Sequence, residues 1–264
     1  MTYFKVHKRT AIAFSGGVDS SLLVRIAADS LGSCNVTAVT CIGLFFPERN
    51  TKAVCDFCNN LGVRLILVKP SMLDDSRVRQ NGSDRCYYCK KMIFEAIQNA
   101  LKDADITVLA EGTNQDDMHD HRPGFKAVRE SGVYSPYLDC GVNKYMIREL
   151  ARELDIKQWN QPSSACLAAC IPTGTPITAE ALQKIEAAEI GLLNLGFIGM
   201  RIRYHGQLAR IEFRDSDSLQ RACTMLRQSV INVIKNAGFE YVTVDLEGYQ
   251  PSGSRQQSTS QSNN

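Results

Sequence analysis

The sequence lacks an excess of charge of either sign and has no long run of apolar residues. Its 30 Lys and Arg residues balance 28 Asp and Glu residues, which leaves a formal net charge of +2 at pH 7. Proteins that bind duplex DNA or tRNA usually carry a strongly basic surface, so nucleic acid is disfavoured as the main partner. No window approaches the roughly 18 apolar residues that a membrane-spanning helix needs. The composition therefore disfavours a membrane protein and a dedicated nucleic-acid-binding protein.

The N-terminal residues also lack an apolar core long enough for an export signal. Behind the charged segment MTYFKVHKRT only AIAF is apolar before polar residues follow. We therefore expect a cytoplasmic location, in which thiols are kept reduced. Ten cysteines in such a protein indicate metal, cluster or catalytic chemistry more often than disulfides, although any one of them can be a small buried apolar residue.

From residue 11 onwards, short apolar runs alternate with segments of helical periodicity. Short buried runs separated by helices are typical of a parallel sheet that is covered on both faces. We therefore predict an α/β domain over residues 1–158. The apolar runs are AIAF, NVTAVTCIGLF, RLILVKP and TVLAEG.

The pattern changes in the last third of the chain. A connector over residues 159–177 is rich in Pro, Ser and Thr and contains two cysteines. Residues 178–250 read as a helix, a strand pair that turns at the dipeptide HG, a helix over about 217–237 and a final strand. This order predicts a small α+β domain with an antiparallel sheet. Residues 251–264 have no apolar content to offset the entropy of ordering, so we expect disorder there.

The segment SGGVDSS stands between the first apolar run and the start of a helix. In such a turn backbone N–H groups converge and the helix adds its positive end, which predicts an anion-binding cradle. Glycines let the main chain approach an oxyanion, serines add hydroxyl donors, and Asp19 can hold Mg²⁺ against phosphates. The segment has no Gly-Lys-Ser/Thr, so nothing in it indicates transfer of a terminal phosphate. The residues of this predicted nucleotide site are Ser15, Gly16, Gly17, Asp19, Ser20 and Ser21.

A generic Gly-Gly turn is the alternative to this nucleotide site. The full SGGVDSS string in a strand–loop–helix context favours nucleotide binding.

Further along, Asp116 and Asp117 follow a strand-end Gly-Thr-Asn, the usual place for ligands at the carboxyl edge of a parallel sheet. We interpret Asp116 as a metal or ribose contact; helix N-capping is the alternative, and one residue can do both. Arg122 is a candidate contact for pyrophosphate.

The SGGVDSS segment resembles the PP-loop of the N-type ATP pyrophosphatases, which cleave ATP to AMP and pyrophosphate and so activate a carboxylate or carbonyl oxygen. Over nearly its whole length the chain resembles one family of these enzymes, the LarE family of ATP-dependent sacrificial sulfur transferases. The matching segments are RCYYCKKMIFEAI, the run from EGTNQDD to SPYLDCGVNKYMIRELARELDI, SSACLAACIPTGTPIT, MRIRYHGQLARIEF and YVTVDLEGY.

The resemblance implies a reaction and a small-molecule nucleotide substrate. Family members insert sulfur into pyridinium-3,5-biscarboxylic acid mononucleotide, which leads to a nickel-pincer cofactor. A carboxylate oxygen attacks the α-phosphorus of ATP, Mg²⁺ and the loop stabilise the departing pyrophosphate, and the resulting acyl-adenylate loses AMP to a sulfur nucleophile. The resemblance also implies a homo-oligomer, namely a hexamer.

Two sources of sulfur remain open. In the sacrificial version a cysteine just ahead of a Pro-x-Gly turn gives up its sulfur and becomes dehydroalanine, and the nearest candidate is Cys166. Alternatively, Cys140, Cys166 and Cys170 hold a [4Fe–4S] cluster whose open iron carries an extra sulfide, as in some LarE-like proteins. The spacing of four places Cys166 and Cys170 on one face of a helical turn. In a third interpretation Cys140 and Cys170 are buried apolar residues beside a reactive Cys166.

Three basic residues are candidates for the phosphate of the substrate. Arg201 and Arg203 alternate on one face of a predicted strand, where two guanidinium groups fit a phosphate monoester. The resemblance assigns them this role near a subunit contact; exposed arginines that only increase solubility are the alternative. It also suggests that Lys90 contacts a phosphate or carboxylate, with a solvated lysine as the alternative. Two CxxC pairs could together bind zinc, and for the second pair, Cys86 and Cys89, the resemblance instead suggests a wall of the substrate site. Their cysteines are Cys55, Cys58, Cys86 and Cys89.

Two other functions compete with sulfur transfer. A tRNA thiolase of the PP-loop class needs a basic groove or an RNA-binding appendage, and the near-zero net charge disfavours it. A non-catalytic adenine-nucleotide-binding protein would keep the cradle and lose the chemistry. The intact Asp19 and the cysteine-rich connector argue against that second alternative.

Overall fold

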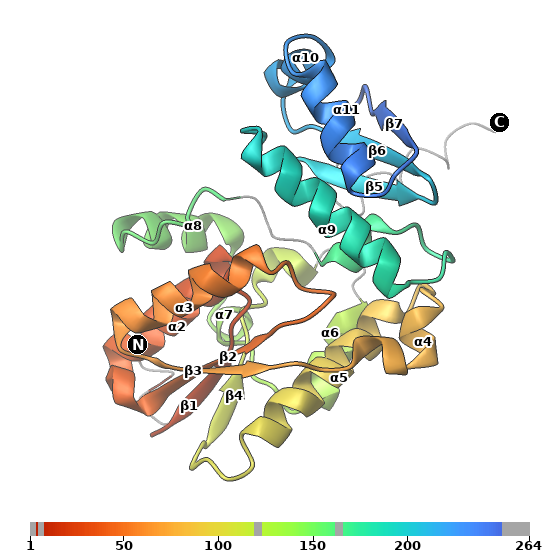
Figure 1. Cartoon of the computed structure of the whole chain (residues 1–264). Helices are drawn as coiled ribbons and strands as arrows, with labels where there is room; N and C mark the ends of the chain where they lie inside the picture. The colour runs from red at the N-terminus through yellow and green to blue at the C-terminus, as the bar shows by residue number, and fades with distance from the viewer. Residues whose placement is uncertain (1–3, 5–7, 119–122, 162–165, 250–264) are drawn as a thin grey trace, which may run out of the picture. The chain divides into compact units, whose positions relative to one another are not determined.

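The structure is a computed structural model, and it describes residue 4 and residues 8–118, 123–161 and 166–249. The predictions made for Arg122 and for the tail at 251–264 lie outside the described residues. The chain divides into two compact units (Figure 1). Unit 1 comprises Met1–Val78 and Gly82–Ser164, and unit 2 comprises Arg79–Asn81 and Ala165–Asn264.

Unit 1 is built on a four-stranded sheet in the order β3-β2-β1-β4, in which every neighbouring pair is parallel. Strands β1, β2 and β4 are almost entirely buried, as expected where both faces of a parallel sheet are covered. The predicted α/β fold with a parallel sheet is therefore confirmed. The strands are β1 (Thr10–Ala13), β2 (Val36–Cys41), β3 (Arg64–Val68) and β4 (Val108–Ala110).

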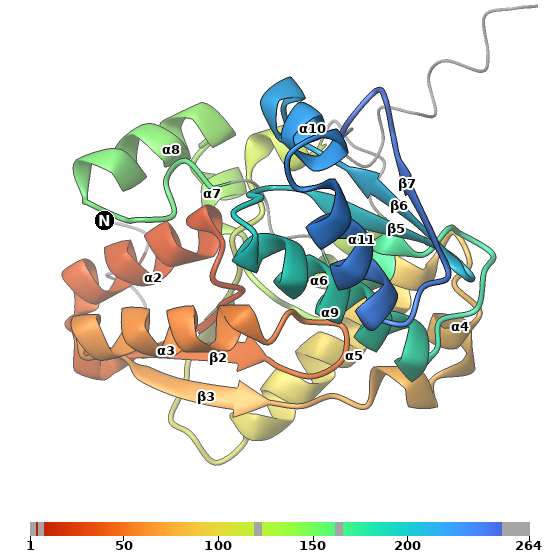
Figure 2. The ribbon, with the colours of Figure 1, turned by 45° about the horizontal axis from the view of Figure 1, so that its top comes forward.

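Helices cover both faces of this sheet (Figures 1 and 2). Because successive side chains of a strand point to opposite faces, Ile12 and Ala38 pack against α2, α3 and α8, whereas Ala11, Val39 and Leu109 pack against α5 and α6. The helices are α2 (Val18–Leu31), α3 (Arg49–Leu61), α5 (Arg85–Ala100), α6 (Pro123–Glu130) and α8 (Lys144–Glu153), with the short α4 (Ser76–Arg79) and α7 (Pro136–Asp139). The 3₁₀ turns are η1 (Ser33–Asn35), η2 (Met72–Asp74) and η3 (Gln115–Met118).

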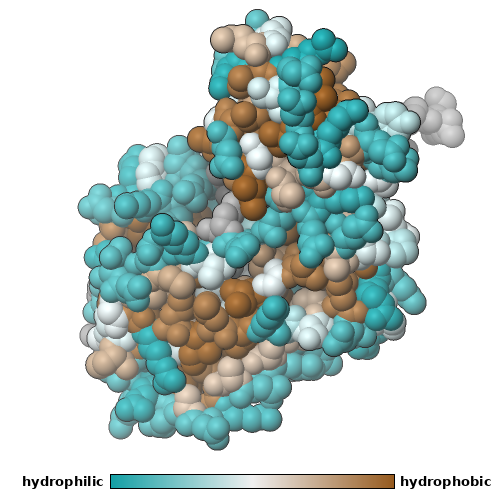
Figure 3. All heavy atoms as spheres, viewed as in Figure 1, coloured by the Kyte–Doolittle hydropathy of each residue, from teal (hydrophilic) through white to brown (hydrophobic). Residues whose placement is uncertain are grey.

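Strand β3 lies at the edge of the sheet, and its residues are only partly covered. Its Leu67 is 41% exposed. In the space-filling view an apolar area interrupts the hydrophilic surface of unit 1 (Figure 3). No helix in the described ranges combines the length and the apolar character needed to cross a membrane.

Unit 2 contains a three-stranded sheet in the order β5-β6-β7. The β5–β6 hairpin is antiparallel as predicted, but β6 and β7 are parallel, so the prediction of an antiparallel sheet is wrong for the third strand. The chain crosses from β6 to β7 through two helices, and such a crossover returns the strand in the same direction. The elements are η4 (Leu167–Cys170), α9 (Ala179–Asn194), β5 (Arg201–His205), β6 (Leu208–Glu212), α10 (Ser216–Cys223), α11 (Arg227–Asn236) and β7 (Tyr241–Val244).

The single helix expected over about 217–237 is two helices. Helix α10 ends at Cys223, and Thr224 leaves the helical region with φ −116° and ψ −90°. The Thr224 hydroxyl donates to the carbonyl oxygen of Gln220 at 2.7 Å. Such a local bond from a Thr side chain competes with helix continuation, and neither Gly nor Pro marks the break in the sequence.

Candidate active site

The SGGVDSS segment joins β1 to α2 at the carboxyl edge of the sheet. Strand β2 lies on one side of β1 and β4 on the other, so this edge is the place where the strand order reverses. Ligands bind at that place in open α/β sheets. The loop after β4 comes close to the segment, because a Cβ atom added to Gly112 would lie 3.2 Å from the Cβ atom of Asp19. The topology therefore brings the two predicted polar loops together.

Hydrogen bonds fix the shape of the loop itself. The backbone N–H of Ser15 donates to the Ser20 hydroxyl at 3.2 Å, and that hydroxyl donates to the carbonyl oxygen of Gly17 at 3.2 Å. Gly16 has φ +79°, and a Cβ atom there would lie 2.7 Å from Cγ1 of Val54 on α3. Glycine is therefore required at 16 for its backbone conformation and for its closeness to a neighbouring helix.

Four of the six predicted loop residues are exposed or half-buried, whereas Ser20 and Ser21 are buried. Ser21 is fully buried, and among the described residues its hydroxyl has no hydrogen-bond partner. Its backbone N–H donates to the carbonyl oxygen of Gly17 at 2.9 Å, in the first turn of α2. The Ser21 side chain therefore faces the interior of unit 1 rather than the loop surface.

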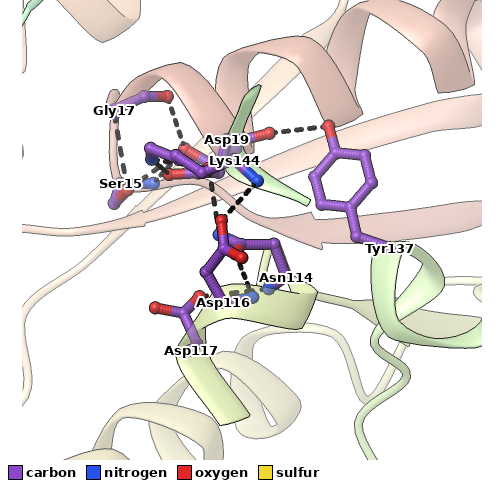
Figure 4. A network of polar contacts seen from close by, with 9 residues as sticks. Ser15, Gly17, Asp19, Asn114, Asp116, Asp117, Tyr137 and Lys144 are labelled. Carbon is purple, nitrogen blue, oxygen red and sulfur yellow. Dashed lines mark hydrogen bonds and ion pairs between the residues drawn. The ribbon is translucent and has the colours of Figure 1, made fainter. Parts of the chain in front are cut away.

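Asp19 stands in the first turn of α2 and is held by three other residues (Figure 4). Nζ of Lys144 lies 2.7 Å from Oδ1 of Asp19, and the Asn114 amide donates to the same oxygen at 3.4 Å. The Tyr137 hydroxyl donates to the main-chain oxygen of Asp19 at 2.9 Å. Burial, and then the charge of Asp19, raise the pKa of Tyr137 well above its usual value. Tyr137 therefore stays a hydrogen-bond donor at neutral pH.

The loop after β4 connects to the same network through its two aspartates (Figure 4). The backbone N–H of Lys144 donates to Oδ2 of Asp116 at 2.8 Å, and the backbone N–H of Asn114 donates to Oδ2 of Asp117 at 3.1 Å. Asp116 therefore satisfies a main-chain donor in the first turn of α8, a role close to the helix-capping alternative.

Sequence reasoning missed Lys144, Asn114 and Tyr137. Asn114 and Lys144 are separated from Asp19 by 95 and 125 positions along the chain, and no local pattern indicates contacts of that kind. The one available signal was their place in segments that resemble the LarE family.

Asp19 is the residue that would hold a magnesium ion bound together with a nucleotide. Mg²⁺ takes oxygen ligands in octahedral geometry, and proteins usually hold it through one or two carboxylates while phosphates and water supply the rest. Asp19 provides such a carboxylate, and its side chain is 26% exposed. A bound Mg²⁺ would neutralise charge on the phosphates beside the loop.

Lys90 pairs with a buried carboxylate in unit 1. Its Nζ lies 3.5 Å from Oε2 of Glu111, which is 5% exposed. Glu111 also accepts hydrogen bonds of 2.7 Å each from the hydroxyls of Thr113 and Ser135. A buried carboxylate needs such partners. Lys90 therefore has a defined ion-pair partner in unit 1, which the alternative of a solvated lysine did not expect.

The cysteines of the connector lie in unit 2. Cys166 is partly exposed and directly precedes η4, whereas Cys170 at its end is 2% exposed. Burial above all, and then the nearby Glu189, raise the pKa of the Cys170 thiol to about 12. Cys140 follows α7 in unit 1 and is exposed.

No group of three or more His, Cys, Asp or Glu side chains placed to hold a metal ion occurs within the ranges that the structure covers. The cluster at Cys140, Cys166 and Cys170 stays a prediction, as does zinc at the CxxC pairs. Cys58 is fully buried in the core of unit 1. This agrees with the expectation that any one cysteine can be a small buried apolar residue.

Two arginines of β5 enter a buried network of ion pairs. Nη1 of Arg201 lies 3.4 Å from Oε2 of Glu189, and Nε of Arg203 donates to Oε2 of Glu212 at 2.9 Å. Nη1 of Arg203 also donates to the carbonyl oxygen of Ala169 at 3.0 Å, within η4. Their side chains are 10% and 16% exposed, so they are not the exposed solubilising arginines of the alternative.

Asn81 fixes the turn that follows the two cysteines. Its side-chain amide donates to the carbonyl oxygens of Pro172 at 2.8 Å and Thr175 at 2.9 Å, and its own carbonyl accepts the N–H of Gly174 at 2.8 Å. Asn81 is fully buried with φ 55°, a conformation that Asn tolerates better than most residues. The Pro-x-Gly turn is thus held from a distant part of the sequence.

A Gly-rich loop at the switch point of a parallel sheet, with an aspartate in the first helical turn, defines a PP-loop nucleotide-binding protein. Comparison with known proteins agrees: residues 2–125 match the family model described as a PP-loop domain. The chain is 32% identical over 246 residues to pyridinium-3,5-bisthiocarboxylic acid mononucleotide synthase of Lactiplantibacillus plantarum, covering 92% of this chain and 87% of that protein. It therefore belongs to the LarE family of PP-loop ATP pyrophosphatases.

Two further relatives are similar over comparable lengths. An uncharacterized protein of Synechocystis is 34% identical over 249 residues, which is 94% of this chain and 92% of the relative. An uncharacterized protein of Methanocaldococcus jannaschii is 31% identical over 244 residues, which is 92% of each. The likeness thus extends through both units, beyond the PP-loop domain.

Proposed function

We propose that this protein uses ATP to adenylate a carboxylate of pyridinium-3,5-biscarboxylic acid mononucleotide and then replaces AMP with sulfur, giving a thiocarboxylate. The observation that carries the proposal is the PP-loop with Asp19 at the switch point of the sheet. The chain is also similar, over 92% of its length, to a synthase of the bisthiocarboxylic acid nucleotide. The product named for that relative differs from the dicarboxylate by the replacement of oxygen by sulfur.

In the first step a carboxylate oxygen attacks the α-phosphorus, the bond from that phosphorus to the bridging oxygen breaks, and pyrophosphate leaves. The exposed Ser15 hydroxyl and the backbone N–H groups in the first turn of α2 are the proposed donors to the pyrophosphate, and the N-terminal end of α2 favours its negative charge. Asp19 and the loop at 111–117 are the proposed contacts for Mg²⁺ and for the rest of the nucleotide. Fixed donors aimed at the leaving group lower the barrier because they need no reorganisation.

In the second step a sulfur nucleophile attacks the acyl carbon and AMP leaves. Cys166 is the proposed nucleophile because it is partly exposed, whereas Cys170 is buried and its raised pKa keeps it protonated. If Cys166 gives up its own sulfur, a base removes its Cα proton and the Cβ–S bond breaks, which leaves dehydroalanine and the thiocarboxylate. If a cluster supplies sulfide, Cys166 remains intact as one of its ligands.

The substrate phosphate is proposed to bind at Arg201 and Arg203. Arg203 donates to Ala169 beside the cysteine turn, so a phosphate held there would be tied to the segment that carries Cys166. Two guanidinium groups offer paired donors to phosphate oxygens. Lys90, which neutralises Glu111 in unit 1, is the proposed contact for a second acidic group of the substrate. The homo-oligomer stays a prediction.

The test is pyrophosphate release with intact-mass analysis after anaerobic purification. With ATP, Mg²⁺ and the dicarboxylate nucleotide, the protein should release pyrophosphate, and Cys166→Ala should release it without forming thiocarboxylate. Cys223→Ala, at an exposed cysteine of α10, serves as the matched control. A protein that forms no pyrophosphate, or a Cys166→Ala variant that transfers sulfur normally, would refute the proposal.

The same samples distinguish the two sulfur sources. Iron and sulfide analysis together with an unchanged mass after turnover supports cluster-borne sulfide. A colourless protein that becomes lighter by one H₂S, located by peptide mapping at Cys166, supports sacrifice.

A further inference from the structure

The loop that is proposed to hold the polyphosphate contains no Lys or Arg between Ser15 and Ser21. Its charged side chain is Asp19, which repels a phosphate unless a cation lies between them. The cation that the structure places on this carboxylate comes from another part of the chain. Nζ of Lys144, in the first turn of α8, lies 2.7 Å from Oδ1 of Asp19 (Figure 4).

Both partners of this ion pair are held from their main chains. The Lys144 backbone N–H donates to Asp116 at 2.8 Å, and the Asp19 carbonyl accepts the Tyr137 hydroxyl at 2.9 Å. Each side chain is 26% exposed, so the pair is within reach of solvent and of a ligand. The lysine side chain is long and flexible, so its ammonium group can move while the backbone stays in place.

A divalent cation and an ammonium group compete for the same carboxylate oxygens, because each needs them as its nearest negative charge. We propose that Lys144 occupies the place of the divalent cation on Asp19 when no nucleotide is bound, and that its ammonium group transfers to the polyphosphate when the metal–nucleotide complex enters. Lys144 thereby supplies the positive charge that the loop sequence lacks. This inference rests on the proposed function in that the anion is the polyphosphate of ATP.

The proposal predicts effects of opposite sign on two ligands. Lys144→Met leaves the Asp19 carboxylate without its ammonium partner, so Mn²⁺ added without nucleotide should bind several-fold more tightly. The same variant loses a cation for the anion site, so pyrophosphate added without metal should bind about tenfold more weakly, as expected for one charge-assisted hydrogen bond. A purely structural role for Lys144 would weaken the binding of both ligands.

The experiment measures Mn²⁺ binding by electron paramagnetic resonance and pyrophosphate binding by calorimetry. Lys144→Arg keeps the charge and should bind pyrophosphate within about threefold of the original protein. Lys126→Met is the matched control, because that lysine is 74% exposed and pairs with Glu130 on α6. In an Asp19→Asn background, Lys144→Met should no longer change Mn²⁺ binding, since the shared carboxylate is gone.

Three results would overturn the inference: effects of the same sign on both ligands, no difference between Lys144→Met and Lys126→Met, or a Mn²⁺ effect that persists in the Asp19→Asn background. Because these are binding measurements without turnover, they are independent of sulfur transfer. A protein that binds both ligands as predicted but releases no pyrophosphate from ATP retains the Lys144 inference and refutes the proposed reaction. A protein that binds neither ligand refutes both.

Discussion

Gly112 lies against Asp19 so closely that a Cβ atom on Gly112 would be 3.2 Å from the Asp19 Cβ atom and 3.2 Å from the backbone nitrogen of Ser20. The loop after β4 thus packs directly onto the first turn of α2. Because those neighbours include backbone atoms, Gly112→Ala must displace the turn by a few tenths of an ångström.

A displacement of that size should lower kcat/KM for ATP cleavage about tenfold, since a shift of about 1 Å can cost about 100-fold. Steady-state pyrophosphate release checks this, with a thermal unfolding curve to confirm that the variant is folded. Gly112→Ala with unchanged kcat/KM would show that the contact does not position Asp19.

The two loop glycines should respond differently to alanine. Gly16 has φ +79° and its added Cβ atom would lie 2.7 Å from Val54, whereas Gly17 has φ −77° and meets the Ser15 hydroxyl only at 3.6 Å. Gly16→Ala should therefore lower the free energy of unfolding by about 1–3 kcal/mol, and Gly17→Ala should change it by less than about 1 kcal/mol. Urea denaturation measures both, and equal losses would contradict the assignment of strain to Gly16.

Removing one partner of the Arg201–Glu189 ion pair should lower the free energy of unfolding substantially. Glu189 is fully buried and Arg201 is 8% exposed, so Arg201→Met removes a cation from a carboxylate without access to water. Breaking a buried pair in this way costs about 3–5 kcal/mol of unfolding free energy. Arg201→Met with Glu189→Met should recover much of the loss. A double variant as unstable as the sum of the two single variants would show that the residues do not interact.

Burial raises the pKa of the Cys58 thiol from 9.0 to about 12, with Cys55 adding to the rise. Because the pKa is higher in the folded state, the stability that this thiol contributes is complete below about pH 9 and is lost as the pH rises toward 12. Cys58→Ala should therefore flatten the fall of unfolding free energy between pH 9 and pH 10.5. Urea denaturation across that range measures the slope, and the exposed Cys34→Ala is the control. Equal slopes in Cys58→Ala and the original protein would contradict this prediction.

The sequence predicts the parallel sheet and the nucleotide loop well, because both depend on local patterns. Apolar runs of strand length separated by amphipathic helices leave few arrangements other than a covered parallel sheet. The segment SGGVDSS at a strand–helix junction indicates anion binding by its residue types alone. The direction of β7 and the break at Thr224 were not predictable in the same way. The direction of β7 depends on the helical crossover that precedes it, and the break depends on a Thr224 side-chain hydrogen bond that neither Gly nor Pro marks in the sequence.

The candidate site was only partly predictable, for a physical reason. Residues of one turn, such as Ser15 and Ser20, can be recognised from a short local motif. Lys144, in contrast, contacts Asp19 from 125 positions away along the chain. The burial of Ser21 likewise follows from the direction in which α2 presents its faces to the core. Tertiary packing sets these features, and a single sequence does not record it.

The most direct test of the account is pyrophosphate release from ATP by the purified protein, with Mg²⁺ and the dicarboxylate pyridinium nucleotide, compared with Asp19→Asn. The original protein should form AMP and pyrophosphate in equal amounts only when the dicarboxylate is present. Asp19→Asn should lose at least about 100-fold in rate, comparable to removing one group that stabilises the transition state. No cleavage by the original protein, or undiminished cleavage by Asp19→Asn, would contradict the central claim that this loop activates a carboxylate with ATP.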